Sequence, residues 1–347
     1  MKSPYPYFGG KSKAAPIVWA RFGDVRNFID PFFGSNAMLL SRPEWHKRQI
    51  ETINDSDGMV SNFWRAVAAA PDEVAHFADW AVNENDLHAR HWWLINQRTD
   101  LHARLEGDPE FYDAKIAGWW VWGMASWIGS GFCSGKGAWA SVDGKLVKVG
   151  RGISQQLPHL GDGGRGINRQ LPSISRNRGI NRQRPQLGNG GASGQGINAI
   201  SDLQAYMREL QARMRRVRVA SGDWTRVLGR SVTYKLGETA VFLDPPYADE
   251  AGRMMGLYTN DSGTVAHEVR KWAIENGDNP KMKIALCGYD VEHGDYMPDS
   301  WEVVEWQPNG GFDGQRKGGR SDNHLRERIW FSPHCLRPSI QRGLFGA

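Results

Sequence analysis

The chain has 347 residues, of which 40% are hydrophobic and 23% charged, and its formal net charge is +5. This composition is typical of a folded protein with one large domain and an embedded subdomain, or with two domains, and it excludes fibrous and wholly disordered chains. The most apolar stretch, residues 117–127, is interrupted by glycines and is much shorter than the roughly 20 residues that span a bilayer, which excludes an integral membrane protein.

Residues 1–13 contain proline, glycine and lysine where a signal peptide needs an apolar run, so we expect a cytoplasmic protein. The three cysteines, Cys133, Cys287 and Cys335, stand far apart in the sequence and form no CxxC pair. This spacing argues against a disulfide framework and against a zinc cluster. We therefore expect no bound metal. The sequence leaves the oligomeric state open, with a monomer as the default.

Short apolar segments predict the strands of a sheet at residues 27–30, 50–54, 217–220, 240–244, 283–287 and 327–330. Because most of these strands alternate with helical patterns, the predicted fold class is α/β with a mostly parallel sheet. Ligands bind at the carboxyl ends of the strands in such sheets. Three acids are predicted to lie at those ends: Asp30, Asp55 and Asp244.

Helical patterns occupy the middle of the chain. Residues 57–128 are predicted to be helical, with breaks at Pro71 and around Asp108, which is predicted to cap a helix that has the following proline at its first position. A second helix is predicted to begin after a Ser201 cap and to run to about Arg216. We interpret its apolar stripe as core.

A basic, glycine-rich repeat occupies residues 151–200, which hold seven arginines, no lysine and one acid. Three similar units begin at Arg151, Arg165 and Arg178, and each contains Gly-Ile and a proline. Arginine grips phosphate through paired hydrogen bonds, so the repeat is a candidate binding site for a polyanion. The alternatives are a solvated basic loop and a linker without a direct function.

The sharpest chemical motif is Asp244-Pro245-Pro246-Tyr247. The strand before it delivers a carboxylate to the edge of the sheet, and the prolines stiffen the backbone and leave carbonyl groups as acceptors. The tyrosine adds a flat aromatic face. Together these groups suit an exocyclic amino group on a planar heterocycle, because both amino hydrogens are accepted while the ring stacks. The alternative is a structural turn.

A second set of residues fits a nucleoside cofactor. The turn after Asp30 is rich in small residues and enters a helix, so its backbone N–H groups can approach a carboxylate or a phosphate. Asp55 is placed to accept ribose hydroxyls, a geometry that a nicotinamide cofactor also fits. Asp223 is a candidate acceptor for an adenine amino group or a helix N-cap. Lys11 pairs either with a cofactor carboxylate or with a neighbouring acid.

Together, these motifs resemble those of the DNA adenine methyltransferase family, in the order that the family has them. The Asp-Pro-Pro-Tyr sequence resembles the catalytic motif, and Pro6-Tyr-Phe-Gly-Gly-Lys11 resembles the N-terminal cofactor motif. Three further segments resemble the loop that holds S-adenosylmethionine, the acidic end of the second strand and the segment beside the cofactor adenine; they are residues 28–37, 53–55 and 221–224. The resemblance covers about residues 4–65 and 215–332.

The resemblance implies roles for particular residues of this chain. The catalytic residues would be Asp244, Pro245, Pro246 and Tyr247. The S-adenosylmethionine site would contain Tyr7, Phe8, Gly10, Lys11, Asp30, Pro31, Phe32, Gly34, Asn36, Asp55, Asp223 and Trp224. Phe8, Phe32 and Phe33 would either attract the sulfonium of the cofactor or belong to the core. Residues 129–137, which include Lys136, fall where the family has a glycine-rich loop that contacts DNA. The repeat that follows has no counterpart in the family, and its charge makes Arg151, Arg165, Arg169, Arg178 and Arg182 DNA-binding candidates, for contact either with phosphates or with guanine edges.

The resemblance also implies the domain organisation. A Rossmann-like methyltransferase sheet with helices on both faces is expected over residues 1–64 and 214–335. An inserted target-recognition region, mainly helical and loop-rich, is expected over residues 65–213 and contains the repeat. Residues 336–347 are expected to form a C-terminal tail.

The chain departs from the family at one position. The family usually has Gly-x-Gly where this sequence has Gly34-Ser35-Asn36. Asparagine tolerates the left-handed backbone conformation that glycine offers. We expect its side chain to take space where the methionine part of the cofactor would lie.

The implied activity is transfer of a methyl group from S-adenosylmethionine to the N6 amino group of adenine in DNA, after the base has been flipped out of the helix. One alternative is methylation of the cytosine N4 amino group. Another is a nucleic-acid-binding protein on a catalytically weakened scaffold, with the repeat as its working part. A third is methylation of an RNA amine or a protein amide.

Deletion of residues 151–200 tests the repeat. If its arginines contact DNA phosphates, the logarithm of the DNA affinity should depend less steeply on the logarithm of the salt concentration, because fewer counterions are released on binding. Affinity measured at several salt concentrations gives this slope for both proteins. An unchanged slope would show that the repeat does not contact phosphates.

Overall fold

The structure is a computed structural model, and it describes residues 1–6, 11–43, 49–127, 132–133, 139–142, 145–148, 197, 200–246, 264–306 and 327–338. A seven-stranded sheet lies at its centre, in the order β5-β2-β1-β6-β7-β9-β8. In that order the strands are Val217–Ser221, Ile50–Asp55, Asn27–Asp30, Thr239–Leu243, Met282–Tyr289, Glu327–Phe331 and Glu302–Glu305. The strands from β5 to β7 are parallel, and β9 is antiparallel to β7 and β8.

The predicted α/β fold and its six predicted strands are therefore confirmed. Strand β8 was not predicted, because Glu302–Glu305 is short and only half-buried at the edge of the sheet. A separate antiparallel ribbon of β3 (Trp139–Val142) and β4 (Lys145–Lys148) was not predicted either.

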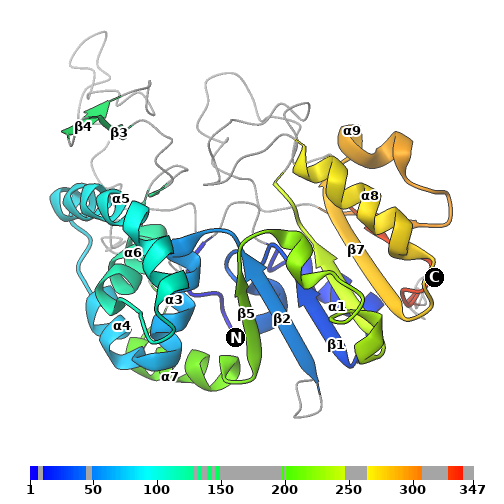
Figure 1. Cartoon of the computed structure of the whole chain (residues 1–347), viewed down its shortest axis with the longest axis horizontal. Helices are drawn as coiled ribbons and strands as arrows, with labels where there is room; N and C mark the ends of the chain where they lie inside the picture. The colour runs from blue at the N-terminus through cyan, green and yellow to red at the C-terminus, as the bar shows by residue number, and fades with distance from the viewer. Residues whose placement is uncertain are drawn as a thin grey trace, which may run out of the picture.

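The helices of the middle region are α3 to α7, with bounds Gly58–Ala69, Pro71–Ala78, Glu84–Gly107, Ala114–Ser126 and Leu203–Met214. Figure 1 shows them gathered beside the β5 edge of the sheet, whereas α8 (Val265–Gly277) lies along β7. The predicted break at Pro71 is confirmed, with that proline at the first turn of α4.

Two predicted helix caps are wrong. Asp108 ends α5, and the next helix starts five residues after Pro109, where Asp113 accepts a hydrogen bond from the Ile116 N–H. Helix α7 is capped by Asp202 rather than by Ser201. The Asp108 carboxylate instead accepts from the Glu110 N–H in the turn between α5 and α6, and Asp202 accepts from the Ala205 N–H in the first turn of α7.

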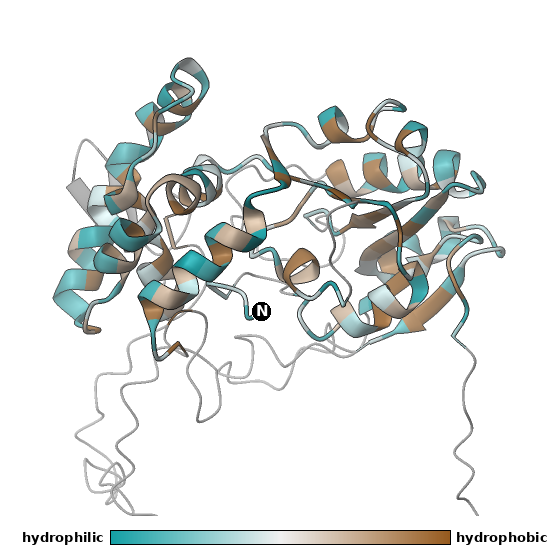
Figure 2. Cartoon of the chain, turned by 90° about the horizontal axis from the view of Figure 1, so that it is seen from below, coloured by the Kyte–Doolittle hydropathy of each residue, from teal (hydrophilic) through white to brown (hydrophobic). Residues whose placement is uncertain are grey.

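Helices cover both faces of the sheet. Successive side chains of a strand point to opposite faces, and Phe28 of β1 packs against Trp19 of α1 (Ala15–Phe22), whereas Ile29 belongs to a second cluster that includes Val269 of α8. Figure 2 shows mostly apolar strands and helices that alternate between apolar and polar residues, as expected for helices with one buried face. Among the described residues, no helix is long and apolar enough to cross a membrane.

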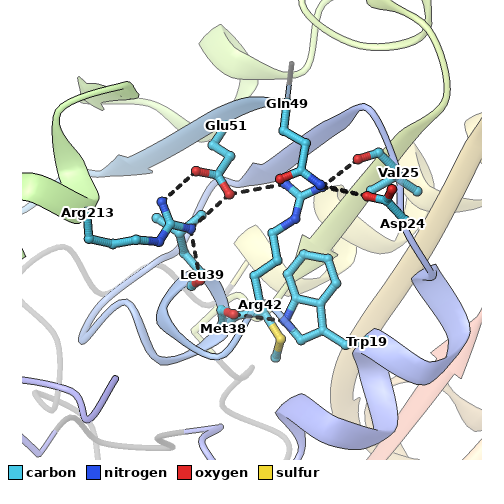
Figure 3. Close-up of polar contacts among 9 residues, drawn as sticks. All are labelled: Trp19, Asp24, Val25, Met38, Leu39, Arg42, Gln49, Glu51 and Arg213. Atoms are coloured by element: carbon cyan, nitrogen blue, oxygen red, sulfur yellow. Dashed lines mark hydrogen bonds and ion pairs between the residues drawn. The ribbon is translucent and has the colours of Figure 1, made fainter. Parts of the chain in front are cut away.

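A buried charge network joins α7 to the first strands (Figure 3). The Glu51 carboxylate in β2, which is 2% exposed, accepts from Arg42 at 3.1 Å and from two nitrogens of Arg213 at 2.7 and 2.9 Å. Arg213 also donates to the Leu39 carbonyl of α2 (Ala37–Leu40), and Arg42 stacks over Trp19 at 5.2 Å. The network therefore links the helix that precedes β5 to the segment that follows β1.

Glu51→Gln should lower the free energy of unfolding by about 3 kcal/mol, because loss of one partner leaves buried charge uncompensated. Asp72→Asn is the control, since the Asp72–Arg208 ion pair is exposed and should contribute much less. Denaturant unfolding of both variants provides the comparison. Equal losses of stability would contradict the role given to Glu51.

Candidate active site

Three acids meet at the carboxyl ends of adjacent parallel strands. Asp30 ends β1, Asp55 ends β2 and Asp244 directly follows β6, in agreement with the placement expected from the sequence. The pKa of Asp30 is raised well above its ordinary value by burial and then by the charges of Asp244 and Asp55. Burial raises the pKa of Asp55 to about 7, and the charge of Asp57 adds to this effect.

Asp55 shapes the loop after β1. One of its carboxylate oxygens accepts from the Gly34 N–H at 3.2 Å, and the other accepts from the Asp57 N–H at 2.9 Å. Gly34 has a φ of 46°, a conformation that favours glycine, and its carbonyl accepts from the Tyr5 hydroxyl at 2.7 Å. The loop is therefore tied to the end of β2 and to the N-terminal segment.

Asn36, where the family usually has glycine, adopts the expected left-handed conformation, with a φ of 61°. Its side chain is fully buried, and Nδ2 approaches the Met214 sulfur of α7 at 3.3 Å. Its Oδ1 has no hydrogen-bond partner among the described residues. The Asn36 side chain therefore packs against α7.

Lys11, which is buried, forms an ion pair with the half-buried Asp244, with 2.9 Å between the Lys11 ammonium and a carboxylate oxygen. Burial alone would lower the pKa of Lys11, but the charges of Asp244 and Glu327 outweigh it and raise that pKa. Burial raises the pKa of Asp244, and Lys11 opposes the rise. Of the two roles considered for Lys11, the structure contains the pairing with a neighbouring acid.

Several residues of this edge were not predicted from the sequence. Glu327 of β9 lies opposite Tyr289 of β7, and Cys287 is two residues earlier on β7. The ring of Trp306 lies 5.5 Å from the Lys11 ammonium. No local sequence motif marks these positions. Glu327, for example, reaches the site only because β9, near the end of the chain, pairs with β7. The described residues contain no group of three His, Cys, Asp or Glu that could hold a metal ion.

Residues 221–224, which the sequence predicts to border an adenine, make contacts within the fold. Asp223 caps the short 3-10 helix η3 (Trp224–Val227) and accepts from the Thr225 N–H at 2.9 Å. Trp224 is 7% exposed, and its ring lies 6.1 Å from that of Phe32. The N-cap role considered for Asp223 is thus confirmed, and Phe32 and Trp224 pack together beside it.

Of the remaining predicted residues, Pro31 and Pro245 are buried and Pro246 is half-buried. The Pro31 carbonyl accepts a hydrogen bond from the Asn54 side chain at 3.1 Å, which fixes the start of the loop after β1. The other predicted site residues lie outside the described residues, and they are Tyr7, Phe8, Gly10, Tyr247, Lys136, Arg151, Arg165, Arg169, Arg178 and Arg182.

The strand order, the antiparallel β9 and the acids at the carboxyl ends of β1, β2 and β6 define a Rossmann-like methyltransferase fold. The family model for D12 class N6 adenine-specific DNA methyltransferase matches residues 7–103. This match confirms the resemblance, and the chain is an enzyme that methylates the N6 amino group of adenine in DNA. The matched residues include Lys11, Asp30 and Asp55, whereas Asp244 lies beyond them. No curated protein matches the chain.

Lys11→Met tests the ion pair, because it removes the charge and keeps a side chain of similar length. The pKa of Asp244 should rise further, and an acid with a higher pKa in the folded than in the unfolded state loses stability as the pH rises between the two values. The thermal unfolding midpoint should therefore fall more between about pH 5 and about pH 8 in the variant than in the wild type.

Lys271→Met on α8 is the control, since Lys271 is exposed. It should keep the wild-type pH dependence. If the Lys11 variant kept it as well, Lys11 would not be what holds down the pKa of Asp244.

Proposed function

We propose that the methyl donor is S-adenosylmethionine and that Asp244 and Pro245 hold the adenine amino group during the transfer. The observation that carries the proposal is the ion pair of Lys11 with Asp244 beside Asp30 and Asp55. An exocyclic amine needs acceptors for its hydrogens, and an acid followed by prolines supplies them.

The charge of the site supports this cofactor. Three carboxylates gather at one edge of the sheet, those of Asp30 and Asp55, which are buried, and that of Asp244, which is half-buried, and the pKa of each is raised. A ligand with positive charge offsets such a surplus. S-adenosylmethionine supplies an activated methyl group on a positively charged sulfur. Asp55 would accept the ribose hydroxyls of the cofactor. Gly34 and Asn36, in the loop after β1, would border the cofactor, and Asp223 and Trp224 would lie beside its adenine.

The protein's own groups would then act by binding and orientation. Asp244 and the Pro245 carbonyl would accept the two amino hydrogens, which localises the nitrogen lone pair that free adenine shares with its ring. Lys11 favours the ionised form of Asp244, in which both carboxylate oxygens are acceptors. Tyr247 would stack on the flipped base. Positioning and stabilisation of the positive charge that develops on the nitrogen then account for catalysis.

We also propose that residues 65–213 recognise the target and that the basic repeat contacts phosphates. The helices α3 to α7 stand as a group beside the β5 edge (Figure 1), next to the strand that ends in Asp55. The repeat contributes seven arginines against one acid. Positive charge of this kind neutralises the DNA backbone.

The decisive experiment incubates the protein with S-adenosylmethionine and unmethylated DNA, digests the DNA and identifies methylated nucleosides by mass spectrometry. N6-methyladenine should form with the wild type and with Glu275→Ala, a change on exposed α8 surface, and should fall by a factor of at least about 100 with Asp244→Ala. Methylcytosine would overturn the choice of base. Undiminished methylation by the Asp244 variant would overturn its catalytic role.

A further inference from the structure

A second carboxylate stands at the end of β2. Asp57 caps α3 by accepting from the Met59 N–H at 2.9 Å, and its own N–H donates to Asp55 at 2.9 Å. The charge of Asp57 raises the pKa of Asp55, second in size only to burial. Asp57 therefore opposes the ionisation of the acid that would hold the cofactor ribose.

Arg98 of α5 pairs with this second carboxylate. One of its terminal nitrogens lies 3.1 Å from the Asp57 carboxylate, and the two side chains are only 18% and 16% exposed. The other terminal nitrogen donates to the backbone carbonyl of Cys133. One guanidinium thus binds the start of α3 and the turn at residues 132–133.

That turn is firmly anchored. Cys133 has a φ of 57°, which is unfavourable for a residue with a side chain and persists only where the surroundings hold it. Its N–H donates to Nδ1 of His91 at 3.3 Å, and burial lowers the pKa of His91 to about 4, so the neutral ring is available as an acceptor. The Phe132 ring fills the space beside Gly123, where an added Cβ would lie 2.0 Å from it.

We propose that Arg98 is a positioning residue of the cofactor site: it neutralises Asp57 and thereby favours the ionised form of Asp55, the acceptor for the ribose hydroxyls. It acts through a continuous chain of contacts, from the Cys133 carbonyl through Arg98 and Asp57 to Asp55 and the Gly34 N–H. This inference rests on the proposed function, because it assumes that a nucleoside cofactor binds at Asp55.

The pH dependence of cofactor binding reports on this role. The charged and titratable groups that act on Asp55 or are acted on by it are Asp57 from the following turn, Asp30 from β1 and Tyr5 from the N-terminal segment. Because the ionised carboxylate is the acceptor, affinity should rise with pH through about 7 and then level off. Loss of Arg98 leaves Asp57 uncompensated and should move this midpoint upward, whereas loss of the Asp57 charge should move it downward.

The experiment measures the affinity of the full chain for S-adenosylmethionine by calorimetry from about pH 5.5 to about pH 9. Arg98→Gln should raise the midpoint by about one pH unit, the effect of a unit charge several ångströms away. Asp57→Asn should lower it, because asparagine keeps the N-cap but not the charge. In the double variant, the Arg98 change should add no upward shift.

Arg104→Gln is the matched control, because this arginine lies on the same helix and packs over the Phe111 ring at 4.0 Å. It should leave the midpoint unchanged. An affinity loss in Arg98→Gln that is equal at all pH values would indicate a structural effect only and would overturn the inference. An unchanged midpoint in Asp57→Asn would also overturn the inference. This variant tests the same series of contacts if the Arg98 variant does not fold. If the wild type bound no S-adenosylmethionine, the proposed function would fail first.

Discussion

The ion pair of Lys11 with Asp244 is the interaction on which the carboxyl edge of the sheet depends. Asp30, Asp55 and Asp244 are brought together there by parallel strands, and their burial raises the pKa of each. A buried charge is tolerated where a partner and hydrogen bonds compensate it. Lys11 supplies such a partner, while backbone N–H groups, including that of Gly34, supply hydrogen bonds to Asp55.

These partners compensate the buried carboxylates only in part, and the pKa values that stay raised point to a function. Asp55 keeps a pKa near 7 even with its backbone donors, and Asp30 stays strongly perturbed. Perturbed acids gathered at the ligand-binding edge of an α/β sheet are typical of an active site. The proposed methyl donor carries positive charge and would relieve the repulsion among these carboxylates.

The middle helices are tied to this edge at several points rather than attached as a separate body. Arg213 and Met214 of α7 contact the segment after β1, through Leu39 and Asn36 respectively. Arg98 of α5 reaches Asp57, beside the acid of β2. The middle helices and the loop after β1 are therefore joined by direct contacts.

Much of the fold could be predicted because its signals are local. Apolar runs marked β1, β2 and β6, and the acids that follow such runs had to lie at one edge once the strands were parallel. Helix caps were predicted less well, since Asp113 and Asp202 compete with acceptors a few residues away, and only the geometry of the first turn selects between them. The left-handed conformation of Asn36 was predictable, but its packing against Met214 was not.

The sequence by itself determined the α/β class and the acids that end the strands, and it predicted the chemistry of Asp244-Pro245-Pro246-Tyr247, because each of these depends on neighbouring residues. Only the tertiary structure decided that Lys11 pairs with Asp244, that Glu327 joins them and that Arg98 pairs with Asp57. These contacts join residues that lie far apart in the chain, and their charges interact only after folding has brought them close together and removed water from between them.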